Sequence, residues 1–185
     1  MTLKTPLLLA GLSLLAPFVA ADDAGSMDAK VAAIVKAAQP ALEALAAQPG
    51  LAAETEARDK EAMSDEAAKT WQARWTAPGA KDIDFKAYLD NQATPEFKKA
   101  MKKVKGLSKL FSLDKNGNVV ATVPKCHDFV HGFEPKFSAC FKSGQMLVNK
   151  PALDLTSKKY SVQISVPIKD ASGTIGVLVG TFGIK

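Results

Sequence analysis

Apolar residues recur at helical spacing in the first third of the chain. Between Met27 and about Ala47 they fall three or four positions apart, which places them on one face of a helix. Alanine is frequent in this stretch and favours the same structure. Pro40 lies inside it, so we expect a kinked helix or two shorter ones. The predicted apolar face consists of Val31, Ile34, Val35, Ala38, Leu42 and Leu45.

A second helix is predicted from about residue 52 to residue 75, after the break at Gln48-Pro49-Gly50. Trp71 and Trp75 are four residues apart and therefore share one face of this helix. A short helical stretch is expected at residues 84–91.

Thr94 and Pro95 predict the start of another helix, with a hydroxyl at the N-cap and proline at the first helical position. Gly106 ends it. Lysines occupy the face of this helix that is expected to contact water. Its buried stripe is predicted to be Phe97, Ala100, Met101 and Val104.

After Gly106 the hydrophobic period changes to two, which is typical of strands. Residues 110–113 and 119–123 flank an Asn-Gly turn and predict a β-hairpin. Residues 160–166 alternate between apolar and polar side chains, and a turn leads into a last strand at 174–183. Helices followed by an antiparallel sheet indicate the α+β class, with the helices packed on one sheet.

The first residues have the pattern of a secretory signal peptide. Lys4 provides a positive charge, Leu7–Leu15 is apolar, and Val19-Ala20-Ala21 places small residues before a cleavage point. We therefore expect residues 1–21 to be removed. The remaining protein is expected to reside in a bacterial periplasm or to be secreted. An uncleaved anchor is the alternative, although the apolar stretch is shorter than the ~20 residues that span a bilayer.

The remaining chain is expected to comprise an N-terminal helical extension at 22–50 and an α+β domain at 51–185. The full sequence is 47% hydrophobic and 23% charged, which excludes a disordered chain. Residues 22–80 carry 6 Lys and Arg against 10 Asp and Glu, whereas residues 81–185 carry 17 against 9. The basic half can attract acidic partners or an anionic membrane, or simply form a solvated surface. Its lysines have no interleaved aromatic platform, so nucleic acid is not expected as a partner.

Two cysteines, Cys126 and Cys140, lie within the predicted exported domain. In an oxidising compartment such a pair most simply forms a disulfide, which stabilises a short loop by about 3 kcal/mol. Two alternatives stay open: free thiols, and a metal site that also uses His127 and His131.

Three segments resemble the periplasmic Cache (PDC, PAS-like) sensor domains. Residues 128–137 are similar to a loop of that family, Asp-Tyr-x-Gln-Gly-Asp-Glu-x-Lys followed by an aromatic residue. Residues 113–121 resemble its first hairpin, and residues 162–178 resemble its closing hairpin. The likeness extends over roughly residues 60–185, and Trp71 lies where the family tends to carry a tryptophan.

The loop also departs from the family pattern. Phe133 replaces the usual Asp, His131 a common Gln, and Val130 a frequent Trp. Cys126-His127 stands in place of the usual hydroxyl pair. Apolar residues and a predicted disulfide thus replace polar groups that could hold a ligand, so a polar ligand of the family's type is not expected.

The resemblance implies a small-molecule pocket between the sheet and the loop after the first hairpin. The polar face of strand 160–166 can aim hydrogen-bonding groups into such a pocket, and the loop can add charge and apolar walls. Each candidate also has a plainer interpretation. The polar strand face can simply be solvated, and the Asp128 carboxylate can cap a turn. His131 can be an ordinary loop histidine, and Trp71 can pack in the core. The candidate ligand-binding residues are Asp128, His131, Phe133, Tyr160, Gln163, Ser165 and Trp71.

The sequence therefore predicts a non-enzymatic module that binds an unidentified small molecule and carries no cofactor. Its expected partners are a membrane sensor protein that reads the ligand state, and a second copy of the chain. One alternative is an exported enzyme in which Cys126 or Cys140 acts with His127 or His131. Another is a haem or metal carrier with the two histidines as ligands.

Overall fold

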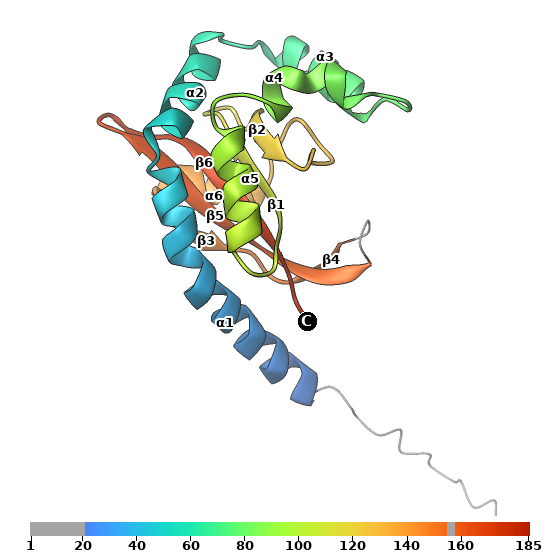
Figure 1. Ribbon diagram of the computed structural model, residues 1–185, viewed down its shortest axis with the longest axis vertical. Coiled ribbons are helices and arrows are strands. Elements are labelled where there is room, and N and C mark those ends of the chain that lie inside the picture. Colours follow the sequence, from blue (N-terminus) through green and yellow to red (C-terminus); the bar gives the residue numbers. More distant parts are fainter. Residues whose placement is uncertain (1–20, 155–157) are drawn as a thin grey trace, which may run out of the picture.

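The computed structural model describes residues 21–154 and 158–185, so residues 1–20 of the predicted signal peptide lie outside it. Six α-helices and one short 3-10 helix, η1, accompany six strands in the described part (Figure 1). The helices are α1 (Ala21–Ala46), α2 (Pro49–Lys60), α3 (Asp65–Thr76), η1 (Asp82–Phe85), α4 (Lys86–Leu89), α5 (Thr94–Lys103) and α6 (Pro135–Ser143). The strands are β1 (Leu107–Leu113), β2 (Val119–Val123), β3 (Leu147–Val148), β4 (Ala152–Asp154), β5 (Lys159–Asp170) and β6 (Gly173–Gly183).

The strands form one antiparallel sheet in the order β2-β1-β6-β5-β3, and β4 pairs with another part of β5. The long hairpin of β5 and β6 is therefore central, and the β1–β2 hairpin joins it through β6. This arrangement confirms the predicted α+β class and both predicted hairpins. Among the described residues, no helix combines the length and apolar character needed to cross a membrane.

One side of the sheet, here called the helix-covered face, packs against α1, α2 and α5. Its core is mostly aliphatic, with Leu42 of α1, Leu51 of α2, and Ile164 and Leu178 from the sheet, and it also contains Phe97 of α5. All five side chains are buried. Figure 1 shows α1 running along the sheet, with its N-terminal part extending beyond it.

The opposite side, here called the loop-covered face, packs against α3, η1, α4, α6 and the segment between β2 and α6. Its core is rich in aromatic residues, with Trp75 of α3, Phe85 of η1 and Tyr88 of α4 around Phe129. Phe111 of β1 supplies the sheet side of this cluster. The two faces thus have separate cores of different chemical character.

Three expectations about the helices are corrected. Pro40 lies within the continuous helix α1 instead of dividing it. The single helix predicted over 52–75 is two helices, because Ala62 has a φ of 47° and Ser64 caps α3 by accepting from the Ala67 amide at 3.2 Å. Thr94 is not the N-cap of α5, since Ala93 is the N-cap and the Thr94 hydroxyl donates to the Asn91 carbonyl.

Candidate functional site

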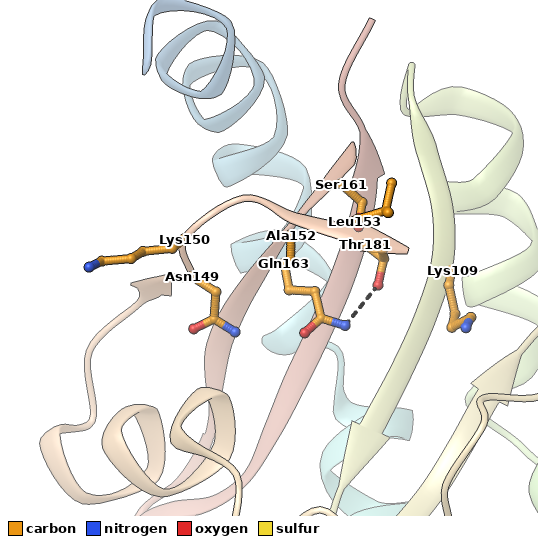
Figure 2. Close-up of a pocket in the computed structure, with 8 residues that line it drawn as sticks. All are labelled: Lys109, Asn149, Lys150, Ala152, Leu153, Ser161, Gln163 and Thr181. Atoms are coloured by element: carbon orange, nitrogen blue, oxygen red, sulfur yellow. Dashed lines mark hydrogen bonds between the residues drawn. The ribbon is translucent and has the colours of Figure 1, made fainter. Parts of the chain in front are cut away.

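Three polar side chains form a row across the loop-covered face. In the sheet register Lys109 of β1 pairs with Thr181 of β6, and Thr181 pairs with Gln163 of β5. Directly opposed residues on neighbouring strands project to the same face of a sheet. Gln163 Nε2 donates a hydrogen bond to Thr181 Oγ1 at 3.4 Å (Figure 2). The sheet therefore places the side chains of Lys109, Thr181 and Gln163 at neighbouring positions of one face.

A hollow of about 260 Å³ lies over this row. Strand β4 forms one wall, because Ala152 pairs with Ser161 of β5. The chain entering β4 is held close by a hydrogen bond of 2.9 Å from the Asn149 amide to the Gln163 carbonyl. The hollow, here called the polar-row pocket, is lined by Lys109, Asn149, Lys150, Ala152, Leu153, Ser161, Gln163 and Thr181.

The donors of the polar-row pocket suit a small anion. Lys109 forms no ion pair with any described residue. Asn149 and Gln163 carry side-chain amides, whereas Lys150 extends away from them in Figure 2. Among the lining residues that the structure describes there is no carboxylate. The site can thus offer charge-assisted and neutral hydrogen bonds to an anionic group.

The three candidate residues of strand β5 have different positions. Gln163 lines the polar-row pocket. Ser165 pairs with Leu147 and Val179, is fully buried, and its hydroxyl has no hydrogen-bond partner among the described residues. Tyr160 is 51% exposed and forms no wall of the pocket.

The loop candidates Asp128 and His131 are not brought to the polar-row pocket. Asp128 Oδ1 accepts a 2.9 Å hydrogen bond from Gln72 Nε2 of α3. The imidazole of His131 is buried, with Nδ1 2.8 Å from Glu134 Oε1 and Nε2 3.0 Å from the Asp128 carbonyl. A neutral ring can donate to one of these oxygens and an imidazolium to both. Phe133, placed among the candidates as an apolar wall, is 79% exposed instead.

Gln72 fastens this loop to α3. Its Oε1 accepts hydrogen bonds from the backbone amides of Phe129 at 2.7 Å and Val130 at 3.0 Å. Together with the bond to Asp128, one side chain satisfies three groups of the loop. The sequence gives no signal for this role, because in the helical pattern Gln72 looks like any polar residue on the solvated face of a helix.

Trp71 packs in the aromatic cluster beneath the loop. Its ring stacks on Phe129 with centroids 5.8 Å apart and meets Tyr88 edge-on at 5.4 Å. Trp75 also contacts Phe129, at 5.4 Å. These rings fill the space between loop and α3, so the structure places Trp71 in a core and not at the polar-row pocket.

The predicted disulfide is not formed in the structure, where Cys126 and Cys140 are separate buried thiols. Cys126 Sγ donates to the Asp128 carbonyl at 3.0 Å. Burial raises the pKa of each thiol to about 11, partly offset by Lys109 for Cys126 and by Lys169 for Cys140. Both cysteines belong to the core of the loop-covered face.

A metal site would need several ligating side chains together. Within residues 21–154 and 158–185, no three His, Cys, Asp or Glu residues are grouped so that they could hold a metal ion. His127 is exposed, whereas His131 is buried and hydrogen-bonded through both nitrogens.

Comparison with known proteins relates the chain to sensor domains by fold. No family model matches the sequence, and no curated protein matches it. The ligand-binding domain of the Pseudomonas aeruginosa amino-acid chemoreceptor PctC, in complex with GABA, is similar with a TM-score of 0.51 and 10% identity. The match covers 89% of this chain and 61% of that one, so the chain spans less than two thirds of its neighbour.

Two further similar structures are also sensor domains. That of the V. cholerae histidine kinase DctB has a TM-score of 0.43 and 15% identity, over 89% of this chain and 56% of that one. That of a Campylobacter jejuni chemoreceptor with isoleucine bound has a TM-score of 0.42 and 13% identity, over 83% and 62%. The PctC likeness confirms the Cache-type fold that the sequence predicts.

Proposed function

We propose that this chain, which has the fold of Cache (PDC) sensor domains, is a non-enzymatic module that binds a small carboxylate-bearing molecule in the polar-row pocket. The observation that carries the proposal is the row of Lys109, Thr181 and Gln163 across three strands. A lysine ammonium forms strong charge-assisted hydrogen bonds with a carboxylate, and the hydroxyl and amide fix its orientation.

The size and charge of the pocket narrow the ligand class. A volume of about 260 Å³ lies just below the ~300–1,000 Å³ of pockets for drug-sized molecules, which favours a ligand of few heavy atoms. A polyamine would find no carboxylate among the described lining residues to pair with its charge. GABA, the ligand of the PctC domain, carries a carboxylate that would suit the Lys109 ammonium.

The two buried thiols support a non-enzymatic role over the cysteine–histidine alternative. A nucleophilic cysteine acts as its thiolate, and burial raises the pKa of both thiols to about 11. The sulfur of Cys126 donates to a backbone carbonyl, and the imidazole of His131 is engaged by Glu134 and Asp128. Neither group is arranged to attack a substrate.

The proposal also includes export, which the signal-peptide pattern of residues 1–21 supports, and signalling through a partner protein. Cleavage after Ala21 would release the domain into the periplasm or medium, where a membrane sensor protein or a second copy could read its ligand state. Expression of the full chain with fractionation and N-terminal sequencing tests this part. A mature chain starting at Asp22 supports it, and a chain retaining Met1 in the cytoplasm contradicts it.

The ligand proposal is tested by thermal shift of the purified domain, using acetate, lactate, succinate and GABA, with spermidine as the cationic comparison. A ligand at 100 times its dissociation constant stabilises the fold by about 2.7 kcal/mol. Calorimetry then compares the wild type with Lys109→Gln, which should weaken binding of the best carboxylate about tenfold through the lost charge.

Lys102→Gln provides the matched control, because Lys102 is an exposed lysine of α5 on the other side of the sheet. It should leave carboxylate binding unchanged. The proposal is overturned if spermidine stabilises the domain and the carboxylates do not, or if Lys109→Gln binds the carboxylate as tightly as the wild type does.

A further inference from the structure

A second hollow, of about 480 Å³, lies between α1 on one side and the start of β1 and the end of β6 on the other. It shares no lining residue with the polar-row pocket. We call it the α1 groove. It is lined by Lys30, Ala33, Ile34, Ala37, Lys105, Gly106, Gly183 and Lys185.

Apart from three lysines, the α1 groove is lined by small or apolar residues. Residues 30, 33, 34 and 37 recur at helical spacing, so α1 presents them on one face. Ile34 is half-buried against the core of the helix-covered face. Opposite, the Gly183 amide donates to the Gly106 carbonyl at 3.1 Å, so this wall is bare backbone. Gly106 has a φ of 83°, a conformation that favours glycine.

Three lysines, Lys30, Lys105 and Lys185, surround this apolar lining, and no acidic residue lines the described part of the groove. None of the three forms an ion pair with a described residue. By contrast, Lys98 and Lys99 on α5 are paired with Asp90 at 4.0 Å and Glu96 at 3.5 Å. Ammonium groups gathered without partners favour an anion between them.

We propose that the α1 groove binds a single-chain amphiphile with an anionic head, such as a monomeric fatty acid. The hydrocarbon chain lies against Ala33, Ile34 and Ala37, and the carboxylate contacts the lysine ammonium groups. A small inorganic anion would leave the apolar wall unused, and a neutral hydrocarbon would leave the lysines unpaired. The volume is within the ~300–1,000 Å³ typical of small-molecule sites.

The test is calorimetry with dodecanoate below its micelle concentration. The wild type should bind one dodecanoate saturably, and octanoate more weakly because fewer methylene groups are buried. Ala37→Trp places a large side chain in the groove from an exposed helix position and should abolish binding. Lys30→Glu combined with Lys105→Glu should weaken binding at least about tenfold through the reversed charges.

Two matched variants separate this site from the rest of the protein. Lys103→Glu changes an exposed lysine of α5 that does not line the groove, and Gln163→Leu changes the polar-row pocket. Both should bind dodecanoate as the wild type does. Circular dichroism melts confirm that each variant is folded, so a loss of binding by Ala37→Trp is not a loss of structure.

Several results would overturn the proposal. Equal affinity for dodecyltrimethylammonium would show that the anionic head does not matter. Unchanged binding by folded Ala37→Trp would place dodecanoate elsewhere. Binding to phosphatidylglycerol vesicles without binding of monomeric dodecanoate would make the lysines a membrane-docking surface. None of these results depends on whether the polar-row pocket binds a carboxylate.

Discussion

The two faces of one sheet differ in what their side chains do. On β5, Val162, Ile164 and Val166 point to the helix-covered face and are buried in an aliphatic core. The alternate residues Ser161 and Gln163 line the polar-row pocket on the other face. A strand has a side-chain period of two, so one segment serves both purposes. The aliphatic core and the polar-row pocket therefore lie on opposite sides of the same backbone.

The loop-covered face is itself divided. Near Lys109 and Thr181 it is polar and open, whereas the next residues along the same strands, Phe111 and Val179, belong to the aromatic cluster. The cluster supports the pocket without contributing donors to it. Substitutions in the two faces should therefore affect stability and binding differently.

Phe97→Ala should have the largest effect, on the helix-covered face. Phe97 of α5 is fully buried in the core of the helix-covered face. Removing a buried phenyl ring costs about 3–5 kcal/mol of unfolding free energy. Urea denaturation measures the loss. Lys98→Ala, at the exposed neighbouring position, should cost under about 0.5 kcal/mol. A small loss for Phe97→Ala would contradict the assignment of stability to this face.

Gln72→Ala should cost about 2 kcal/mol, since three hydrogen-bonded groups of the loop lose their partner. The effect should be local. Hydrogen exchange of the Phe129 and Val130 amides should accelerate more than exchange of amides in α1. Gln39→Ala, an i to i+4 partner of Glu43 on α1, is the control. Uniform acceleration throughout the domain would contradict a local role.

Glu134→Gln should cost about 1 kcal/mol at pH 7 and nothing in acid. Burial raises the pKa of Glu134, but hydrogen bonds from His131 and Lys136 outweigh it and hold the pKa below the ordinary 4.5. A lowered folded-state pKa adds stability that is present above pH 4.5 and disappears as the pH falls through the folded value. Thermal melts from pH 7 to pH 3 should show wild type and variant converging below pH 4.5. A gap that does not narrow as the pH falls below 4.5 would be inconsistent with this origin.

Phe133→Ser should have the smallest effect. The ring is 79% exposed, and substitutions at such positions change stability by less than about 0.5 kcal/mol. Carboxylate affinity should also be unchanged, because Phe133 does not line the polar-row pocket. Calorimetry with the best carboxylate checks this. A clear loss of affinity would show that the loop carrying Phe133 contributes to ligand binding.

Local patterns predicted much of the fold. The two hairpins were predictable because alternation and turn residues lie close together in sequence, and Phe97 was predictable from helical spacing. Helix α6 was not predicted, although Pro135 at its start and Gly144 at its end are typical boundary residues. Residues 128–137 resemble a loop of the Cache family, so the resemblance predicts a loop where α6 begins.

The candidate site was predictable only in part. Gln163 was identified from the polar side of a single strand. Lys109 and Thr181 were missed because they meet Gln163 only through the register of three strands, which no local pattern specifies. The disulfide prediction failed for the same reason. An even number of cysteines is a property of the composition alone. Whether Cys126 and Cys140 can bond depends on how α6, which carries Cys140, lies over the sheet.

The central claim is that the polar row holds a carboxylate. It is tested most directly by NMR of the side-chain amides of Gln163 and Asn149, while the most strongly stabilising carboxylate is titrated into the labelled domain. Both amides should shift saturably with one dissociation constant, and the amide of Gln39 on α1 should not shift. Saturable binding that leaves both Gln163 and Asn149 unshifted would contradict it.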